Sequence, residues 1–122
     1  MCSSFQMRHR LRNRRDFQRV QHCGQKQHCK HYIVIQEPNR LGVRRLGVTA
    51  SKKIGGAVKR NRVKRITREV FRVYFRQFPD STDVVCIAKK GSHDLKMQEA
   101  AREILGCLMA GHSGKKNFSP GF

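Results

Sequence analysis

The fold is decided by residues 57–78, AVKRNRVKRITREVFRVYFRQF, in which apolar and basic side chains recur with the period of a helix. At about 100° per residue, the apolar side chains gather on one side and most basic ones on the opposite side. The expected core side consists of Val63, Ile66, Val70, Val73 and Tyr74. The expected charged side consists of Arg60, Lys64, Arg65, Arg68 and Arg72. We therefore predict a helix from Ala57 to about Phe78, just before Pro79, with one face buried and one displayed.

The charge around this helix has a single sign. Between Pro38 and Arg68 the chain contains many Lys and Arg residues and no Asp or Glu, and only Glu69 breaks the run. A merely solvated helix face is the alternative, but such faces usually mix both signs so that i,i+4 pairs form. A concentrated positive field favours a polyanion, and arginine suits bidentate phosphate contacts. We interpret the helix as a rigid nucleic-acid-binding face.

The whole composition agrees with a basic binding protein. The chain has 122 residues, 27 of them Lys or Arg and 8 Asp or Glu, for a formal net charge of +19. This length fits one domain with a modest core, which we assign to residues 1–110. Residues 111–122 are small, polar and Gly- and Pro-bearing, so we expect a disordered tail. Self-repulsion at this charge predicts that bound anions stabilise the fold.

The cysteines indicate a reducing compartment. There are 5 of them, an odd number without regular spacing, and no secretory signal precedes them. We therefore predict reduced thiols and a cytoplasmic protein. The apolar runs fall far short of the roughly 20 residues that span a bilayer, which argues against a transmembrane role.

The remaining elements follow from local patterns. A short helix is expected from Arg14 to Gln21, strands over His31–Gln36 and Arg44–Ala50, and a last helix over Leu95–Met109. Turn residues between the two strands favour an antiparallel pair. Asp83–Ala88 is a continuous apolar run typical of a buried central strand. The order helix-strand-strand(-strand)-helix-strand-helix predicts an α+β fold, a two-layer sandwich with helices on one side of a small sheet.

One group of residues has the composition of a metal site. It consists of His22, Cys23, His28, Cys29 and His31. The spacing matches no standard zinc knuckle and no second pair of ligands follows, so we interpret the segment as a polar loop with incidental thiols. No metal site is predicted.

The acidic residues do not suggest a nuclease centre. The 8 carboxylates are scattered along the chain, whereas hydrolysis of nucleic acid usually needs clustered carboxylates for two metals or a pair of histidines. His93 and Asp94 are adjacent, but neighbours rarely point together and no nucleophile accompanies them. We predict no catalytic residue. Phe17 and Tyr32 have basic neighbours and could stack unpaired bases, although each could equally be part of the core.

Two stretches together resemble a known family. Residues 45–65, RLGVTASKKIGGAVKRNRVKR, are similar to the signature of the bacterial ribonuclease P protein component, with its Gly-containing strand, Ser-Lys-Lys turn and Arg-Asn-Arg motif. Arg10-Leu11 ahead of Asp16-Phe17, and the strand over Asp83–Ala88, also resemble the family at the expected places. The resemblance covers roughly residues 8 to 110.

The resemblance implies a role in tRNA processing. Members form the small subunit of a ribonucleoprotein endonuclease that removes the 5′ leader from precursor tRNA. The family implies that catalysis belongs to the RNA subunit, with Mg²⁺ bound mainly by RNA, and that the protein alone is inactive. The expected partners are the ribonuclease P catalytic RNA and precursor tRNA, without a membrane.

The resemblance also implies roles for particular residues. Those on the helix that would face the catalytic RNA are Arg60, Asn61, Arg62, Lys64, Arg65 and Arg68, with Lys52 and Lys53 beside it. Phe17 and Tyr32 would lie in a cleft between the first helix and the sheet that grips the single-stranded leader. Gln21 and Ile35 stand where the family often has further aromatics, so stacking is less well supported than phosphate contact. The family also implies a left-handed βαβ crossover, which general handedness rules disfavour.

Two other classes of protein stay open at this point. A general RNA-binding or RNA-chaperone protein, or a ribosome-associated one, would bind many RNAs with little preference. A DNA-binding architectural protein would need a helix fit for the major groove.

Overall fold

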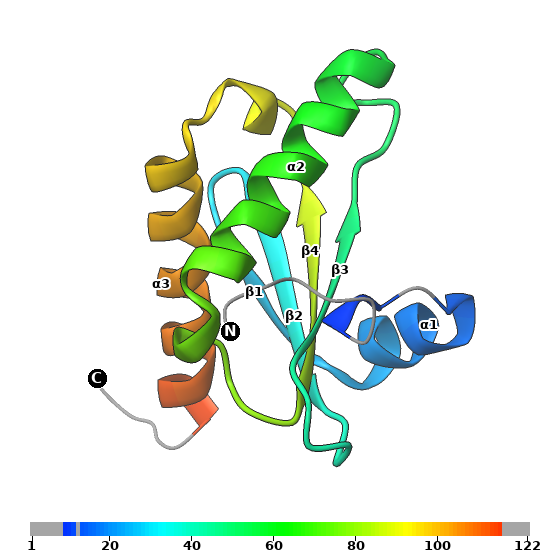
Figure 1. Ribbon diagram of the computed structural model, residues 1–122, viewed down its shortest axis with the longest axis vertical. Coiled ribbons are helices and arrows are strands. Elements are labelled where there is room, and N and C mark those ends of the chain that lie inside the picture. Colours follow the sequence, from blue (N-terminus) through cyan, green and yellow to red (C-terminus); the bar gives the residue numbers. More distant parts are fainter. Residues whose placement is uncertain (1–8, 12, 116–122) are drawn as a thin grey trace.

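The computed structural model describes residues 9–11 and 13–115 (Figure 1). In chain order the helices and strands are α1 (Arg14–Cys23), β1 (Gln25–His28), β2 (Tyr32–Pro38), β3 (Arg45–Thr49), α2 (Ala57–Val73), β4 (Thr82–Ala88) and α3 (Met97–Lys115). Two short 3₁₀ turns, η2 (Phe75–Gln77) and η3 (Ser92–Asp94), lie on either side of β4 in the sequence. The predicted α+β class is confirmed.

The sheet has four strands in the order β1-β2-β4-β3. β2 is antiparallel to β1 and to β4, whereas β3 is parallel to β4. The predicted antiparallel pair of β2 and β3 is therefore wrong, because β4 lies between them. β4 takes this place because almost all of its side chains are buried and those from Val84 to Ala88 are apolar, as predicted for a central strand.

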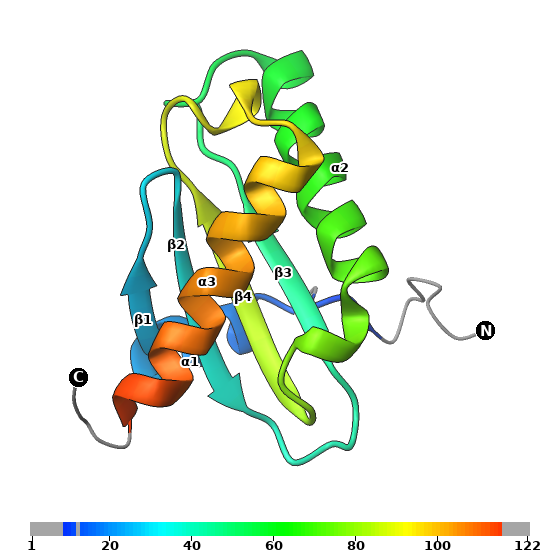
Figure 2. The same cartoon turned by 90° about the vertical axis from the view of Figure 1, so that its left-hand side faces the viewer.

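The connection from β3 through α2 to β4 is left-handed. Figure 2 views the sheet from the side of α2 and α3, with β3 and β4 both running upward and β4 to the left of β3. Crossovers between parallel strands are right-handed in nearly all proteins. This feature followed from the family resemblance alone.

The helices cover both faces of the sheet. α2 and α3 lie on one face, whereas α1 lies on the other, so the prediction of helices on a single side is wrong for α1 (Figures 1 and 2). Successive residues of a strand point to opposite faces of the sheet, and β2 and β4 have apolar residues on both faces. Val34 and Cys86 face the larger core under α2 and α3, whereas Ile35 and Val85 face a smaller core under α1.

The predicted core side of α2 is confirmed except at Val73, since Val63 and Val70 are buried and Ile66 and Tyr74 pack against the core. Val63, Thr67, Val70 and Phe71 are buried, whereas Val73 is 45% exposed. An aromatic cluster decides this orientation, since the ring of Phe71 packs edge-on against the ring of Phe78 with 4.9 Å between centroids. The helix also ends at Val73, and the predicted extension to Phe78 is replaced by η2.

Two end regions depart from the prediction. β1 was not predicted, because its residues are polar and it gains its structure from pairing with β2 at the sheet edge. α3 runs to Lys115, so residues 111–115 continue the helix and do not begin a disordered tail. Residues 116–122 lie outside the described residues.

Cys29 and Cys107 are paired as a disulfide, with 6.5 Å between their Cα atoms, so the prediction of reduced thiols is wrong for these two. Cys23 is exposed and Cys86 is buried, and both are unpaired. Burial raises the pKa of the Cys86 thiol to about 12. Cys2 lies outside the described residues. Within residues 9–115, no helix is long and apolar enough to cross a membrane.

Candidate nucleic-acid interface

The N-terminus of α2 is strongly positive. Gly56 caps the helix in an extended conformation, and no side chain accepts a hydrogen bond from the first-turn amides. The preceding turn displays Lys52 and Lys53 to solvent and is anchored by Ile54, which is buried. The uncapped amides, the helix dipole and two lysines therefore place positive potential at one end of the helix.

Three of the predicted residues form an outer strip on α2, namely Asn61, Arg62 and Arg65. All three are exposed, and with Val58 they line a surface hollow of about 380 Å³. The Nε of Arg62 donates to the carbonyl of His93 in η3 at 2.9 Å, which fixes the direction of its guanidinium. The hollow combines aliphatic stems with charged tips, a combination suited to a base plane and its phosphate.

The other three predicted residues form an inner strip, namely Arg60, Lys64 and Arg68. They recur at i, i+4 and i+8 and are half-buried beside the core. Burial, and then the nearby charge of Arg10, lowers the pKa of Arg68. Because Arg10 bridges to Leu46 of β3, this strip faces the β3 edge. The predicted residues thus occupy two strips, and the like charges of the inner one would be relieved by a phosphate.

An apolar strip lies beside α1 on the other face of the sheet. It consists of Phe17, Ile33 and Ile87, which are partly buried and pack against the smaller core. The Phe17 ring rests on Gly47, where an added Cβ would lie 2.6 Å from the ring Cζ. Ile33 pairs with His28 of β1, and the neighbouring Lys26 pairs with Ile35, so a basic edge adjoins this face.

Tyr32 does not belong to this strip, and its predicted place in a cleft with Phe17 is wrong. Its side chain is fully buried on the opposite face of the sheet, and its hydroxyl shares a 3.2 Å hydrogen bond with Thr67 Oγ1 of α2. Burial is the main cause that raises the pKa of Tyr32 to about 12. Strand alternation explains the error, because the next residue, Ile33, is the one that shares a face with Phe17.

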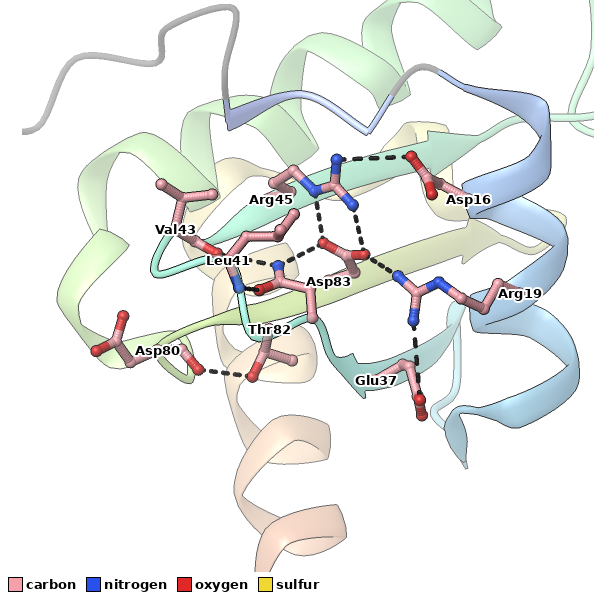
Figure 3. A network of polar contacts seen from close by, with 10 residues as sticks. Asp16, Arg19, Glu37, Leu41, Val43, Arg45, Asp80, Thr82 and Asp83 are labelled. Carbon is pink, nitrogen blue, oxygen red and sulfur yellow. Dashed lines mark hydrogen bonds and ion pairs between the residues drawn. The ribbon is translucent and has the colours of Figure 1, made fainter.

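A polar network joins α1 to the sheet at the base of this face (Figure 3). Its centre is the fully buried carboxylate of Asp83 on β4. Arg45 of β3 donates to both oxygens, from Nε at 2.7 Å and from Nη2 at 2.8 Å. Arg19 of α1 and Asn39 donate to the same carboxylate.

The charges in this network are matched. Burial disfavours the Asp83 anion, but hydrogen bonds from Arg45 and Asn39, together with the charges of Arg45 and Arg19, outweigh it and lower the pKa of Asp83. The hydrogen bond to Asp83 in turn raises the pKa of Arg45. No local sequence pattern signals this network, because the partners of Asp83 lie 38, 44 and 64 residues away from it in the chain.

The other carboxylates of the chain also have partners within the protein. Each of the 8 acidic side chains forms an ion pair with, or accepts a hydrogen bond from, another group of the protein: Asp16, Glu37, Glu69, Asp80, Asp83, Asp94, Glu99 and Glu103. The surplus positive charge is therefore carried by side chains such as those of the outer strip.

Two of the residues considered for a metal have other partners. Cys29 is bonded to Cys107, and His31 contacts Glu103 through both its amide nitrogen and Nδ1. In the part of the chain that the structure describes, no group of three or more His, Cys, Asp or Glu side chains could hold a metal ion.

Fold and surface together define a class of protein: a small basic α+β domain with a left-handed crossover, whose crossover helix displays cations at fixed positions. The Ribonuclease P family model matches residues 5–110. The chain is 42% identical over 100 residues to the ribonuclease P protein component of Syntrophus aciditrophicus, covering 82% of this chain and 83% of the relative. The chain therefore belongs to the ribonuclease P protein component family.

Solved structures agree with this assignment. The RNase P protein of Staphylococcus aureus superposes with a TM-score of 0.75 at 29% identity, covering 83% of this chain and 93% of that one. The RNase P protein of Thermotoga maritima gives a TM-score of 0.74 at 30% identity, with 81% and 94% covered.

Proposed function

We propose that this protein is the protein subunit of a bacterial ribonuclease P. It binds the catalytic RNA and the 5′ leader of precursor tRNA, and thereby assists endonucleolytic removal of the leader in the cytoplasm. The observation that carries the proposal is the pair of cationic strips held rigidly on α2 in a chain of this family.

The two strips of α2 supply affinity for folded RNA. Arginine and lysine side chains that neutralise phosphates release counterions, so binding is strong at low salt and weakens as salt rises. The inner strip and the lysines before α2 serve phosphates, whereas the outer strip also offers the apolar floor of its hollow to a base.

The α1 side supplies a surface for a single strand. Phe17 offers one aromatic edge beside Ile33 and Ile87, and a stacked base contributes about 1 to 3 kcal/mol. Arg14 and Arg15 are exposed on α1 and Lys26 on β1, so phosphates of an extended strand could be neutralised along this face. With Tyr32 in the core, stacking rests mainly on Phe17.

The protein supplies no reacting group in this proposal. Its carboxylates pair with its own cations and amides, and we assign Mg²⁺ mainly to the RNA. By screening repulsion between the phosphates of the two RNAs, the protein would raise the affinity for precursor tRNA and for Mg²⁺.

The test is cleavage of a precursor tRNA by a bacterial ribonuclease P RNA at low Mg²⁺, with and without the protein, beside a protein-only control. Cleavage at the leader junction that requires both components is expected. Absence of stimulation while RNA binding is intact would overturn the proposal in favour of a general RNA-binding protein.

A further inference from the structure

The buried carboxylate of Asp83 lies where separate parts of the chain meet. Its partners come from α1 (Arg19), from β3 (Arg45) and from the segment after β2 (Asn39). Figure 3 shows Arg19 and Arg45 reaching it from two sides. A buried charge is costly unless it is paired and hydrogen-bonded, and this one is paired by two guanidinium groups. Such an arrangement fixes the relative position of its partners.

Asp83 takes part in one polar link from α1 to the sheet and holds the arginine that makes another. Arg19 reaches Asp83 directly, and Arg45, which Asp83 holds in a bidentate pair, reaches Asp16 of α1 at 3.5 Å. Asp16 and Arg19 lie on either side of Phe17 in the sequence. The network therefore restrains the turn of α1 that carries the partly buried Phe17 ring.

We propose that Asp83 is a positioning residue that holds α1 against the sheet and so sets the spacing between Phe17 and the Ile33–Ile87 pair. The inference rests on the proposed function, in which this apolar strip receives the single-stranded leader. Asp83 itself is fully buried and would act only through Arg19 and Arg45.

The charges give this role a distinctive signature. Asp83 neutralises cations, so removing its charge makes the protein more positive and general affinity for RNA does not fall. Affinity that depends on the leader falls, because Phe17 loses its fixed position. A loss of leader preference with retained RNA affinity separates positioning from simple loss of an RNA contact.

The experiment uses the holoenzyme reconstituted with a bacterial ribonuclease P RNA. The measured quantity is the ratio of affinities for precursor tRNA and for the same tRNA without its leader. Asp83→Asn and Arg19→Gln are expected to lower the ratio by about tenfold, the effect of losing one stacked base. Asp80→Asn is the matched control, since it removes the same charge three positions before Asp83. The side chain of Asp80 is 74% exposed, and the ratio of this variant is expected to stay at the wild-type value.

Melting curves accompany each variant. Arg19→Gln keeps the bidentate pair of Arg45 and Asp83, so it decides the matter if Asp83→Asn does not fold. Arg19→Lys, which retains a cation, should restore most of the ratio. An unchanged ratio in folded Arg19→Gln would overturn the positioning role, whereas a wild-type holoenzyme that ignores the leader would overturn the proposed function itself.

Discussion

At the scale of single residues, Gly47 of β3 is in close contact with the Phe17 ring of α1. A Cβ at this position would lie 2.6 Å from Cζ of Phe17 and 3.3 Å from Cβ of Leu11. We expect Gly47→Ala to displace the Phe17 ring, to destabilise the protein by about 1 to 3 kcal/mol and to weaken leader-dependent binding. Urea unfolding and the leader ratio measure the two effects.

Gly106 is the matched control for this substitution. It lies within α3, and an added Cβ would meet nothing within 4 Å. Gly106→Ala should therefore stabilise the protein, by about 0.5 to 1 kcal/mol, through helix propensity alone. If Gly47→Ala behaved like Gly106→Ala, the close contact with Phe17 would be of no consequence.

Asp83 also predicts how stability depends on pH. Its pKa is lowered in the folded protein, so the stability it contributes is present above the ordinary aspartate pKa of about 4 and is lost as pH falls through the folded value. Arg45, whose pKa the hydrogen bond to Asp83 raises, stays charged over this range.

Urea unfolding of wild type and Asp83→Asn between pH 6 and 3 measures this contribution. The wild type should lose more stability than the variant on acidification. Parallel losses in the two proteins would show that Asp83 is not the group that titrates.

At the scale of elements, α2 separates free cations from paired ones. Arg65 is exposed in the outer strip, whereas Arg72, two turns later, is paired with Glu69. Arg65→Ala should weaken binding to the catalytic RNA and reduce the slope of log K against log salt by about one, and Arg72→Ala should have a smaller effect. Binding titrations over a salt series provide both numbers, and equal slopes in wild type and Arg65→Ala would argue against phosphate contact by this strip.

Local sequence patterns predicted where the helices and strands lie better than they predicted which strands pair. The period of α2 and the apolar run of β4 are properties of contiguous residues, and both elements lie close to where the sequence placed them. The partner of β3 is decided by long-range packing, since Arg45 of β3 pairs with Asp83 of β4 and all of α2 lies between these two residues in the sequence. No local pattern distinguishes that pairing from a hairpin with β2.

The residues of the candidate site also differ in how well the sequence predicted them. The basic residues of α2 could be predicted because exposed charges on a helix follow from its period. The α1 side could not, because it depends on which parity of β2 faces α1, and Tyr32 and Ile33 are both plausible strand residues. In α2 the prediction missed Phe71, which packs against Phe75 and Phe78 in the core, and wrongly included Val73, which is exposed.

At the scale of the whole molecule, the net charge of +19 predicts dependence on anions. An anion that binds only the folded state raises the free energy of unfolding, and once its concentration exceeds Kd this increase grows with the logarithm of the concentration. Sulfate or phosphate should raise Tm, and chloride at matched ionic strength should do so less. A melting curve indifferent to the choice of anion would contradict this expectation.

The disulfide joins distant parts of the chain. Cys29 and Cys107 are separated by 78 residues, and His31 contacts Glu103 one helical turn before Cys107. A cross-link closing a loop of this size stabilises the folded state by about 4 kcal/mol in the chain-entropy description. Reduction, or Cys29→Ser, should therefore lower Tm, whereas Cys23→Ser at an exposed unpaired thiol should not. A Tm insensitive to reductant would show that the pair adds nothing to stability.

The position of β4 between β2 and β3 has a consequence for synthesis on the ribosome. Strands β2 and β3 emerge early but have no edge in common, and the strand that joins them is complete only at Ala88. Until then the nascent chain carries two open strand edges, and such edges invite pairing with other chains. Translation that stalls before Thr82 would thus leave a highly charged fragment whose sheet is incomplete, one better suited to proteolysis than to partial function.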